Sequence, residues 1–244
     1  MGLIGLVGAL ALLGIAGAGR AGTTAAVVAA SVYAAVAFLV LRAIAGPDGP
    51  RRFGSANLVT LLRAGLAALV TGLALEALAT GSGLLASPGE VGDPWAWAVP
   101  VGALLALILD GIDGWLARRG RLASAFGARF DMEADALLML GLSLAVLAGG
   151  RTGPWVLLAG VLRYGFVAAG AIWPVLAAPL PPSFRRKALC VATGVALAVG
   201  LVPAVPPTVA GVLAGAGVLA LVYSFAVDTV WLLRRQAATA LTNT

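Results

Sequence analysis

Long apolar runs recur along the chain and are separated by short segments that contain proline, glycine and arginine. A helix needs about 20 mainly apolar residues to cross the hydrocarbon core of a bilayer, which is roughly 30 Å thick. Runs of this kind occupy residues 2–19, 23–42, 57–79, 95–117, 130–149, 154–174, 188–203 and 208–233. The pattern therefore predicts an all-α, polytopic membrane protein with eight transmembrane helices.

The basic residues test this division of the chain. Eight crossings place the segments 42–56, 118–129, 175–187 and the residues after 233 on one side of the membrane. Twelve of the 16 lysine and arginine residues fall in these segments. Lysine and arginine gather in the cytoplasmic loops of membrane proteins. We therefore expect both termini in the cytoplasm and place the chain in a bacterial inner (plasma) membrane.

Composition narrows the class of protein further. Hydrophobic residues make up 61% of the chain, charged residues only 11%, and the mean hydropathy is +1.03, so the bilayer is the main solvent. The net charge of +6 follows from arginines between the apolar runs, so nucleic acid is not an expected partner. The absence of histidine excludes histidine bases, nucleophiles and metal ligands. The single Cys190 cannot form an internal disulfide.

Acidic residues are concentrated in one segment, because five of the ten fall between residues 110 and 135. This segment reads DGIDGWLAR over 110–118 and GARFDMEAD over 127–135. Asp110 and Asp113 are three residues apart at the end of one predicted helix, and Asp131 and Asp135 are four apart at the start of the next. Both spacings place side chains on one helix face. A short turn makes the two helices antiparallel neighbours, so the four carboxylates can converge.

Four carboxylates in one membrane-level site oppose one another's ionisation unless a cation joins them. An all-oxygen cluster suits Mg²⁺ or Mn²⁺, and two such ions, roughly 3.5–4 Å apart, can clamp a diphosphate. The small residues Gly114, Ala117 and Gly127 leave room for a phosphate or a base, and Arg118 offers paired donors to phosphate oxygens. Acidic helix caps neutralised by nearby arginines would explain one or two acids, but not four on two converging faces.

These residues match the pattern D-x2-D-G-x2-A-R-x8-G-x3-D-x3-D, and the segment resembles the signature of the CDP-alcohol phosphotransferase (CDP-alcohol phosphatidyltransferase) family. The segments 57–63 and 183–187 resemble the family's opening segment and its cytoplasmic loop before the fifth core helix. The resemblance implies a six-helix core, a homodimer and a site that opens to the cytoplasm. The expected organisation is an N-terminal two-helix membrane extension (1–45), a cytoplasmic linker (46–56), the catalytic domain (57–235) and a C-terminal tail (236–244).

The resemblance also implies roles for individual residues. Two metal ions would be held by Asp110, Asp113, Asp131 and Asp135. The CDP moiety would be bordered by Asp110, Asp113, Gly114, Ala117, Arg118, Gly127, Asn57 and Thr60. Asp135, the last acid of the signature, would be the base that takes the proton of the acceptor hydroxyl.

A second group of polar residues is basic. We predict that Arg163, Arg185 and Lys187 bind the acceptor, while Arg186 equally fits the cytoplasmic charge bias or contact with anionic lipid headgroups. Arg163 lies inside an apolar run, where an arginine is a functional candidate, and its alternative is a buried ion pair with Asp228 or Glu76. Both of these acids are interpreted as structural.

Together these features predict a membrane transferase of phospholipid biosynthesis. It would move a phosphatidyl group from CDP-diacylglycerol to an alcohol acceptor, with release of CMP. The basic group favours a phosphorylated polyol such as glycerol phosphate or inositol phosphate as that acceptor. One alternative is transfer of a small phospho-alcohol headgroup from a CDP-alcohol to a lipid alcohol. Another is an ion or metal transporter, which is less consistent with acids gathered at one face.

Overall fold

The structure is a computed structural model, and it describes residues 23–45, 54–81, 94–119 and 125–242. Within these ranges the chain forms seven α-helices, three short 3₁₀ turns and no strand, which confirms the all-α prediction. The helices are α2 (Thr23–Ala45), α3 (Ser55–Thr80), α4 (Ala98–Arg119), α5 (Ala125–Ala148), α6 (Leu158–Ile172), α7 (Phe184–Gly200) and α8 (Pro207–Thr242). The 3₁₀ turns are η1 (Pro94–Trp97), η2 (Pro154–Leu157) and η3 (Pro174–Ala177). The predicted helix at 2–19 lies outside the described residues.

Among the described residues, four helical segments are long and apolar enough to cross a membrane: Thr24–Arg42, Ser55–Thr80, Pro154–Ile172 and Pro207–Ala237. Their outward-facing apolar side chains are widely exposed, as for Phe38 (62%) and Val212 (72%), which suits a surface surrounded by lipid. The chain is therefore an integral membrane protein. Helix α7 has 17 residues and begins with three cations, and α5 begins with the acidic segment, so the number of crossings stays a prediction.

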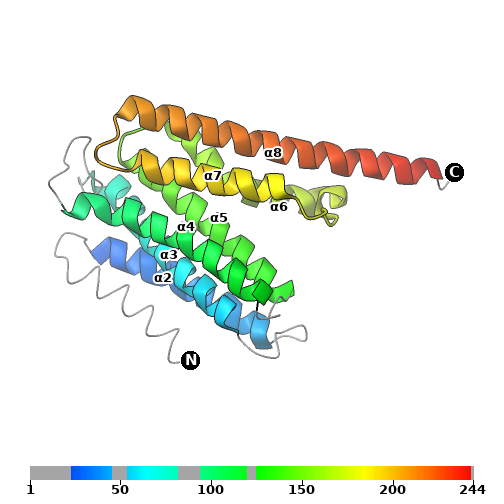
Figure 1. Cartoon of the computed structure of the whole chain (residues 1–244), viewed down its shortest axis with the longest axis horizontal. Coiled ribbons are helices and arrows are strands. Elements are labelled where there is room, and N and C mark those ends of the chain that lie inside the picture. The colour runs from blue at the N-terminus through cyan, green and yellow to red at the C-terminus, as the bar shows by residue number, and fades with distance from the viewer. Residues whose placement is uncertain (1–22, 46–53, 82–93, 120–124, 243–244) are drawn as a thin grey trace.

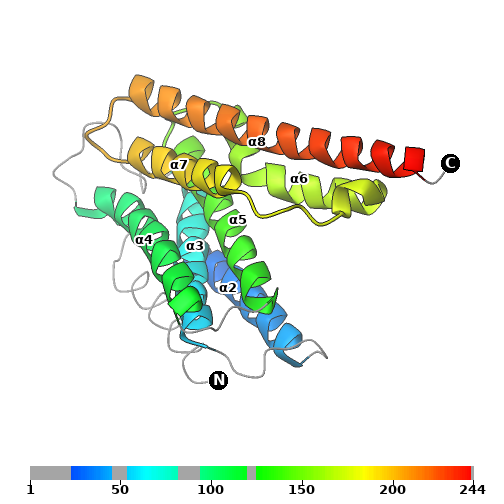
Figure 2. The same ribbon diagram turned by 45° about the vertical axis from the view of Figure 1, so that its right-hand side comes forward.

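Helix α3 lies at the centre of one group of helices and packs against α2, α4 and α5 (Figures 1 and 2). Helices α7 and α8 lie side by side as a second group, and α6 packs against both α5 and α8. Small residues allow the close approach of the two groups. A Cβ at Gly160 of α6 would lie 2.6 Å from the Cα of Leu140 in α5, and one at Gly194 of α7 would lie 2.9 Å from Leu107 in α4.

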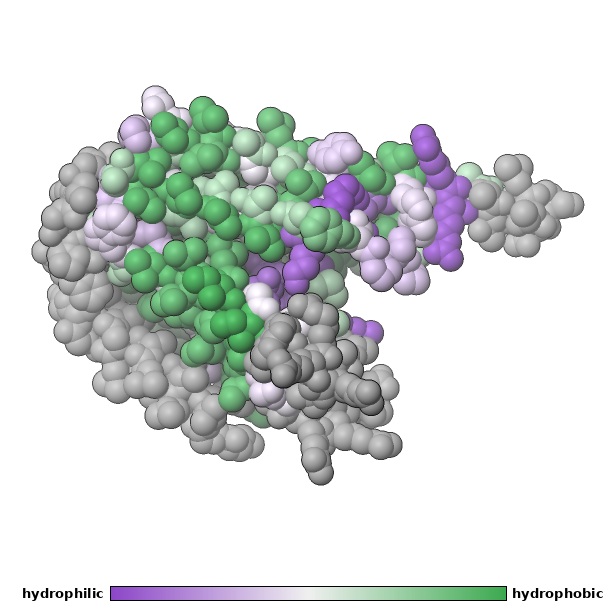
Figure 3. Space-filling model, in the orientation of Figure 1, coloured by the Kyte–Doolittle hydropathy of each residue, from purple (hydrophilic) through white to green (hydrophobic). Residues whose placement is uncertain are grey.

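The last helix is longer than a bilayer crossing requires. With 36 residues, α8 extends for about 54 Å at 1.5 Å per residue, compared with a hydrocarbon core of roughly 30 Å. Figure 1 shows its C-terminal end projecting beyond the other helices. In Figure 3, hydrophilic residues gather in the hollow between this projection and the rest of the molecule. The polar end of the bundle is therefore the end where α5 and α7 begin and α4 finishes.

Candidate active site

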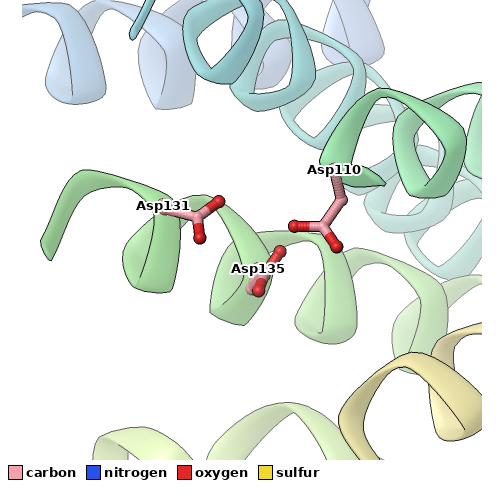
Figure 4. A group of neighbouring side chains, drawn as sticks. All are labelled: Asp110, Asp131 and Asp135. Atoms are coloured by element: carbon pink, nitrogen blue, oxygen red, sulfur yellow. The ribbon is translucent and has the colours of Figure 1, made fainter. Parts of the chain in front are cut away.

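Three of the four signature aspartates meet at this polar end. Asp110 belongs to the last turns of α4, and Asp131 and Asp135 lie one turn apart near the start of α5 (Figure 4). One carboxylate oxygen from each residue lies within 4.8 Å of the others. The side chain of Asp110 is 7% exposed, whereas those of Asp131 and Asp135 are 33% and 34% exposed. The cluster therefore has one buried acid and two acids that are partly exposed.

Asp113, Ala117 and Arg118 belong to α4, but their side chains lie outside the described residues. Gly114 and Gly127 are described, and both are half-buried, in α4 and α5 respectively. The predicted contact of these positions with CDP stays a prediction.

A buried arginine that the sequence interpretation did not assign to the site joins the three carboxylates. Arg63 of α3 is 2% exposed, and its Nη1 donates to Asp131 Oδ1 at 2.7 Å. Its Nη2 pairs with Asp135 Oδ1 and lies 3.1 Å from Asp110 Oδ1. Its Nε donates to the carbonyl oxygen of Ala106 in α4 at 3.2 Å. One guanidinium therefore connects α3, α4 and α5.

A signal for Arg63 was present in the sequence. An arginine inside an apolar helix is a functional candidate by position alone. It also follows Asn57 and Thr60 at steps of three residues, which puts all three near one face of α3. Asn57 and Thr60 are 8% and 3% exposed, and the Thr60 hydroxyl donates to Ala56 O at 3.1 Å. This face of α3 is thus a polar strip inside an apolar helix.

Of the predicted acceptor residues, Lys187 comes nearest to the carboxylates, with Nζ 4.0 Å from Asp110 Oδ2 and a side chain that is 56% exposed. Arg185 instead reaches α8, where it donates to Ser224 Oγ at 2.9 Å and to Asp228 Oδ1 at 2.6 Å. Arg186 shares Asp228 at 3.3 Å. At the start of α7, Lys187 therefore lies beside the carboxylate cluster, whereas Arg185 and Arg186 pair with Asp228.

The structure gives Arg163 a different ion-pair partner from the two acids that the sequence suggested. Arg163 pairs with Glu133 of α5, so the alternative pairing with Asp228 or Glu76 is wrong. Arg163 pairs with Glu133 because α6 packs against α5 with this residue toward it, and the sequence alone does not reveal how the two helices are oriented. Asp228 pairs with Arg185 and Arg186 of α7, which agrees with its interpretation as a structural residue. One of these partners, Arg185, is also a predicted acceptor residue. Glu76 is buried and accepts a hydrogen bond from the backbone of Ala25.

The described residues fit a hard divalent cation. The atoms that the three aspartates offer to a metal ion are all carboxylate oxygens, which Mg²⁺ and Mn²⁺ prefer as ligands. Asp110 Oδ1 is buried and accepts no hydrogen bond, although Arg63 is within ion-pair distance of it. The three carboxylates lie near only two cations in the described structure, the buried Arg63 and the exposed Lys187. The described cluster therefore has an excess of negative charge, which a bound metal ion would neutralise.

The fold and the cluster define a polytopic membrane protein with a candidate metal centre built where helices of its bundle meet. The sequence model of the CDP-alcohol phosphatidyltransferase family matches residues 53–227, and the chain therefore belongs to this family. No curated protein and no solved structure gives a significant match. Membership makes the chain a transferase that moves a phosphatidyl or other phospho-alcohol group from a CDP-alcohol to an alcohol acceptor. The match contains every described residue of the cluster and leaves out α2.

Proposed function

We propose that the protein transfers the phosphatidyl group of CDP-diacylglycerol to a phosphorylated polyol, such as glycerol phosphate or inositol phosphate, and releases CMP. The observation that carries this proposal is the convergence of Asp110, Asp131 and Asp135 around Arg63. The cluster lies within the segment that matches the family and at the polar end of the bundle.

In this proposal Asp110, Asp131 and Asp135, together with Asp113, hold two Mg²⁺ or Mn²⁺ ions. Bound divalent ions would neutralise the diphosphate oxygens and stabilise the charge that develops on the departing CMP. The residues of the chain do the remaining work. Arg63 holds the carboxylates of α4 and α5 in one place, and the buried Asp110 anchors the side of the cluster away from water.

Asp135 takes the proton of the acceptor hydroxyl. Its side chain is one-third exposed, so an acceptor can reach it, and Arg63 engages Oδ1, so Oδ2 receives the proton. The hydroxyl oxygen then forms a bond to the phosphorus that carries the diacylglycerol. The bond from that phosphorus to the bridging oxygen breaks, and CMP leaves with the electron pair. The atoms and charges balance without a further reactant.

The cations of α7 support a phosphorylated acceptor. Lys187 is exposed and lies beside the carboxylate cluster, so its ammonium can bind an acceptor phosphate next to Asp110. Arg185 is held by Ser224 and Asp228, which fixes its guanidinium near the same helix end. An unphosphorylated acceptor would gain little from these charges. Without them, an acceptor phosphate would be repelled by the neighbouring aspartates.

The acceptor is tested with the purified protein, labelled CDP-diacylglycerol and matched pairs of alcohols: glycerol phosphate against glycerol, and inositol phosphate against inositol. We expect labelled lipid product only from a phosphorylated member. Lys187→Ala should raise the KM for that acceptor about tenfold, because one charge-assisted contact is lost. The KM for CDP-diacylglycerol should change by less than about twofold. Preference for the unphosphorylated alcohols would overturn the acceptor assignment and leave the family assignment intact.

A further inference from the structure

Helix α2 lies outside the segment that matches the family, yet it packs directly on the central helix of the fold (Figures 1 and 2). The two backbones are in close contact at Gly72 of α3. A Cβ at this position would lie 2.7 Å from Ala25 O and 2.9 Å from Ala29 Cβ in α2. Any larger residue at Gly72 would separate the helices, so α3 is shaped to receive α2.

A buried acid joins the same two helices. Glu76 of α3 is 5% exposed, and its Oε2 accepts a hydrogen bond from the backbone N–H of Ala25 at 2.6 Å. Ala25 is in the first turn of α2, where backbone N–H groups have no partner within their own helix. A carboxylate at this end of a helix is favourable, and burying one among apolar groups without such partners is costly. Glu76 is therefore matched to the start of α2.

Further along α2, its side chains pack against the parts of α3 and α5 that carry the carboxylate cluster and Arg63. Tyr33 and Val40 of α2 belong to one buried apolar cluster with residues of α3 and α5. Its remaining buried members are Leu61, Ala64, Ala68, Phe130 and Ala134. Ala64 follows Arg63 in the chain, and Phe130 and Ala134 directly precede Asp131 and Asp135. We call this set the α2 cluster.

Packing in the α2 cluster fixes the rotation of α5. Neighbouring residues of an α-helix point about 100° apart, so a helix face held at 130 and 134 sets the direction of 131 and 135. The ring centroids of Phe126 and Phe130 lie 6.0 Å apart, which extends the held face by one turn. Asp131 and Asp135 are then directed toward Arg63, whose own neighbour Ala64 belongs to the same cluster.

We propose that α2 is a brace for the metal-binding carboxylates, with Tyr33 and Val40 as positioning residues that act through Phe130 and Ala134. This inference rests on the metal-dependent transfer proposed above. The working unit of the protein then begins before the family match, with α2 setting the geometry of Asp131 and Asp135. Tyr33 and Val40 would affect how tightly the site binds a metal ion without touching substrate.

The test is a titration of the full-length purified protein with Mn²⁺, in which electron paramagnetic resonance measures the free ion. We expect Tyr33→Ala and Val40→Ala to raise the Mn²⁺ dissociation constant about tenfold, because residues that orient ligands contribute to metal affinity on this scale. Phe38→Ala and Leu39→Ala are the matched controls, since both side chains are on α2 and are 62% exposed. They should bind as the unaltered chain does. Glu76→Leu should weaken binding, and Glu76→Gln, which keeps an acceptor for Ala25, should restore it.

Circular dichroism at the titration temperature identifies the variants that fold, and Val40→Ala decides the question if Tyr33→Ala does not fold. Wild-type Mn²⁺ affinity in the folded α2 variants would overturn the brace and leave the metal site in place. Failure of the unaltered chain to bind Mn²⁺ would overturn both the brace and the metal site of the proposed function.

Discussion

Arg63 is the residue on which the carboxylate cluster depends most. It brings a permanent charge to acids from two other helices, and its forked guanidinium can reach several oxygens at once. A lysine carries the same charge but lacks the planar set of donors. Because the side chain is 2% exposed, water cannot take its place beside the carboxylates. Removing one member of a buried charge network typically costs about 3–5 kcal/mol.

Arg63→Ala should lower the rate of CMP release about 100-fold or more, since the carboxylates lose the group that holds them together. Arg63→Lys should recover only part of this loss. Added Mg²⁺ should raise the thermal midpoint of Arg63→Ala more than that of the unaltered chain, because the ions supply the missing positive charge.

Arg235→Ala is the control for Arg63, because Arg235 is exposed on α8 and lies over the ring of Trp231. It should leave both the rate and the midpoint nearly unchanged. A wild-type rate of CMP release in folded Arg63→Ala would show that the cluster does not need this guanidinium.

At the residue scale, the sequence predicted what depends on local spacing. Helical periodicity places Asp110 and Asp113 on one helix face, and Asp131 and Asp135 on one face of the next helix. The role of Arg63 depends on contacts across 43 to 72 positions of the chain, and no periodicity reveals those. The same holds for Arg163, whose partner Glu133 is 30 positions away.

Helices α5 and α6 form an interface with both a steric and an ionic contact. Gly160 allows α6 to approach the backbone of α5, and Arg163 pairs with Glu133 two turns nearer the start of α5. Arg163 Nε is buried and donates no hydrogen bond within the described part of the chain. The guanidinium is therefore only partly satisfied by Glu133, which is consistent with a further ligand during turnover.

The two members of this pair allow a structural role to be separated from a binding role. Arg163→Ala should raise the acceptor KM about tenfold, with the KM for CDP-diacylglycerol changed by less than about twofold. Glu133→Gln should leave the acceptor KM unchanged or lower it, because it frees the guanidinium. If both variants lose the same thermal stability and neither alters the acceptor KM, Arg163 is a structural residue only.

Most elements follow from the hydrophobic pattern, with differences at their ends. The predicted run 188–203 begins at Phe184 in the structure, because the Ser183 hydroxyl accepts a hydrogen bond from the Arg186 backbone and caps the helix before the apolar run begins. The predicted runs 95–117 and 154–174 each open with a proline-led 3₁₀ turn. The packing of α2 on α3 could not be predicted, since two of the contacts that fix it are the close approach at Gly72 and a hydrogen bond to a backbone N–H.

The described basic residues are unevenly distributed between the two ends of the bundle. The site end contains the cations Arg185, Arg186 and Lys187 at the start of α7, with Arg234 and Arg235 near the projecting end of α8. The opposite end has the buried Arg151, which donates to the carbonyls of Val202 and Val205. The charge bias of membrane proteins predicts that the site end faces the cytoplasm. The homodimer and the domain limits at 45, 56 and 235 stay predictions.

This orientation predicts opposite locations for two reporter fusions. A cytoplasmic reporter should be active after Thr244, and a reporter that requires export should be active within residues 82–93, because an odd number of crossings separates them. The reciprocal fusions serve as controls and should be inactive. Activity of one reporter type at both positions would contradict the topology without touching the chemistry.

The central claim is that the aspartate cluster catalyses group transfer from a CDP-alcohol, and release of CMP from the purified protein tests it most directly. With CDP-diacylglycerol and glycerol phosphate or inositol phosphate, CMP should appear only when both substrates and Mg²⁺ or Mn²⁺ are present, and a chelator should stop it. Asp135→Asn should lower the rate about 10³-fold or more, because the base is lost. CMP release that persists in the chelator, or at the wild-type rate in Asp135→Asn, would contradict the account.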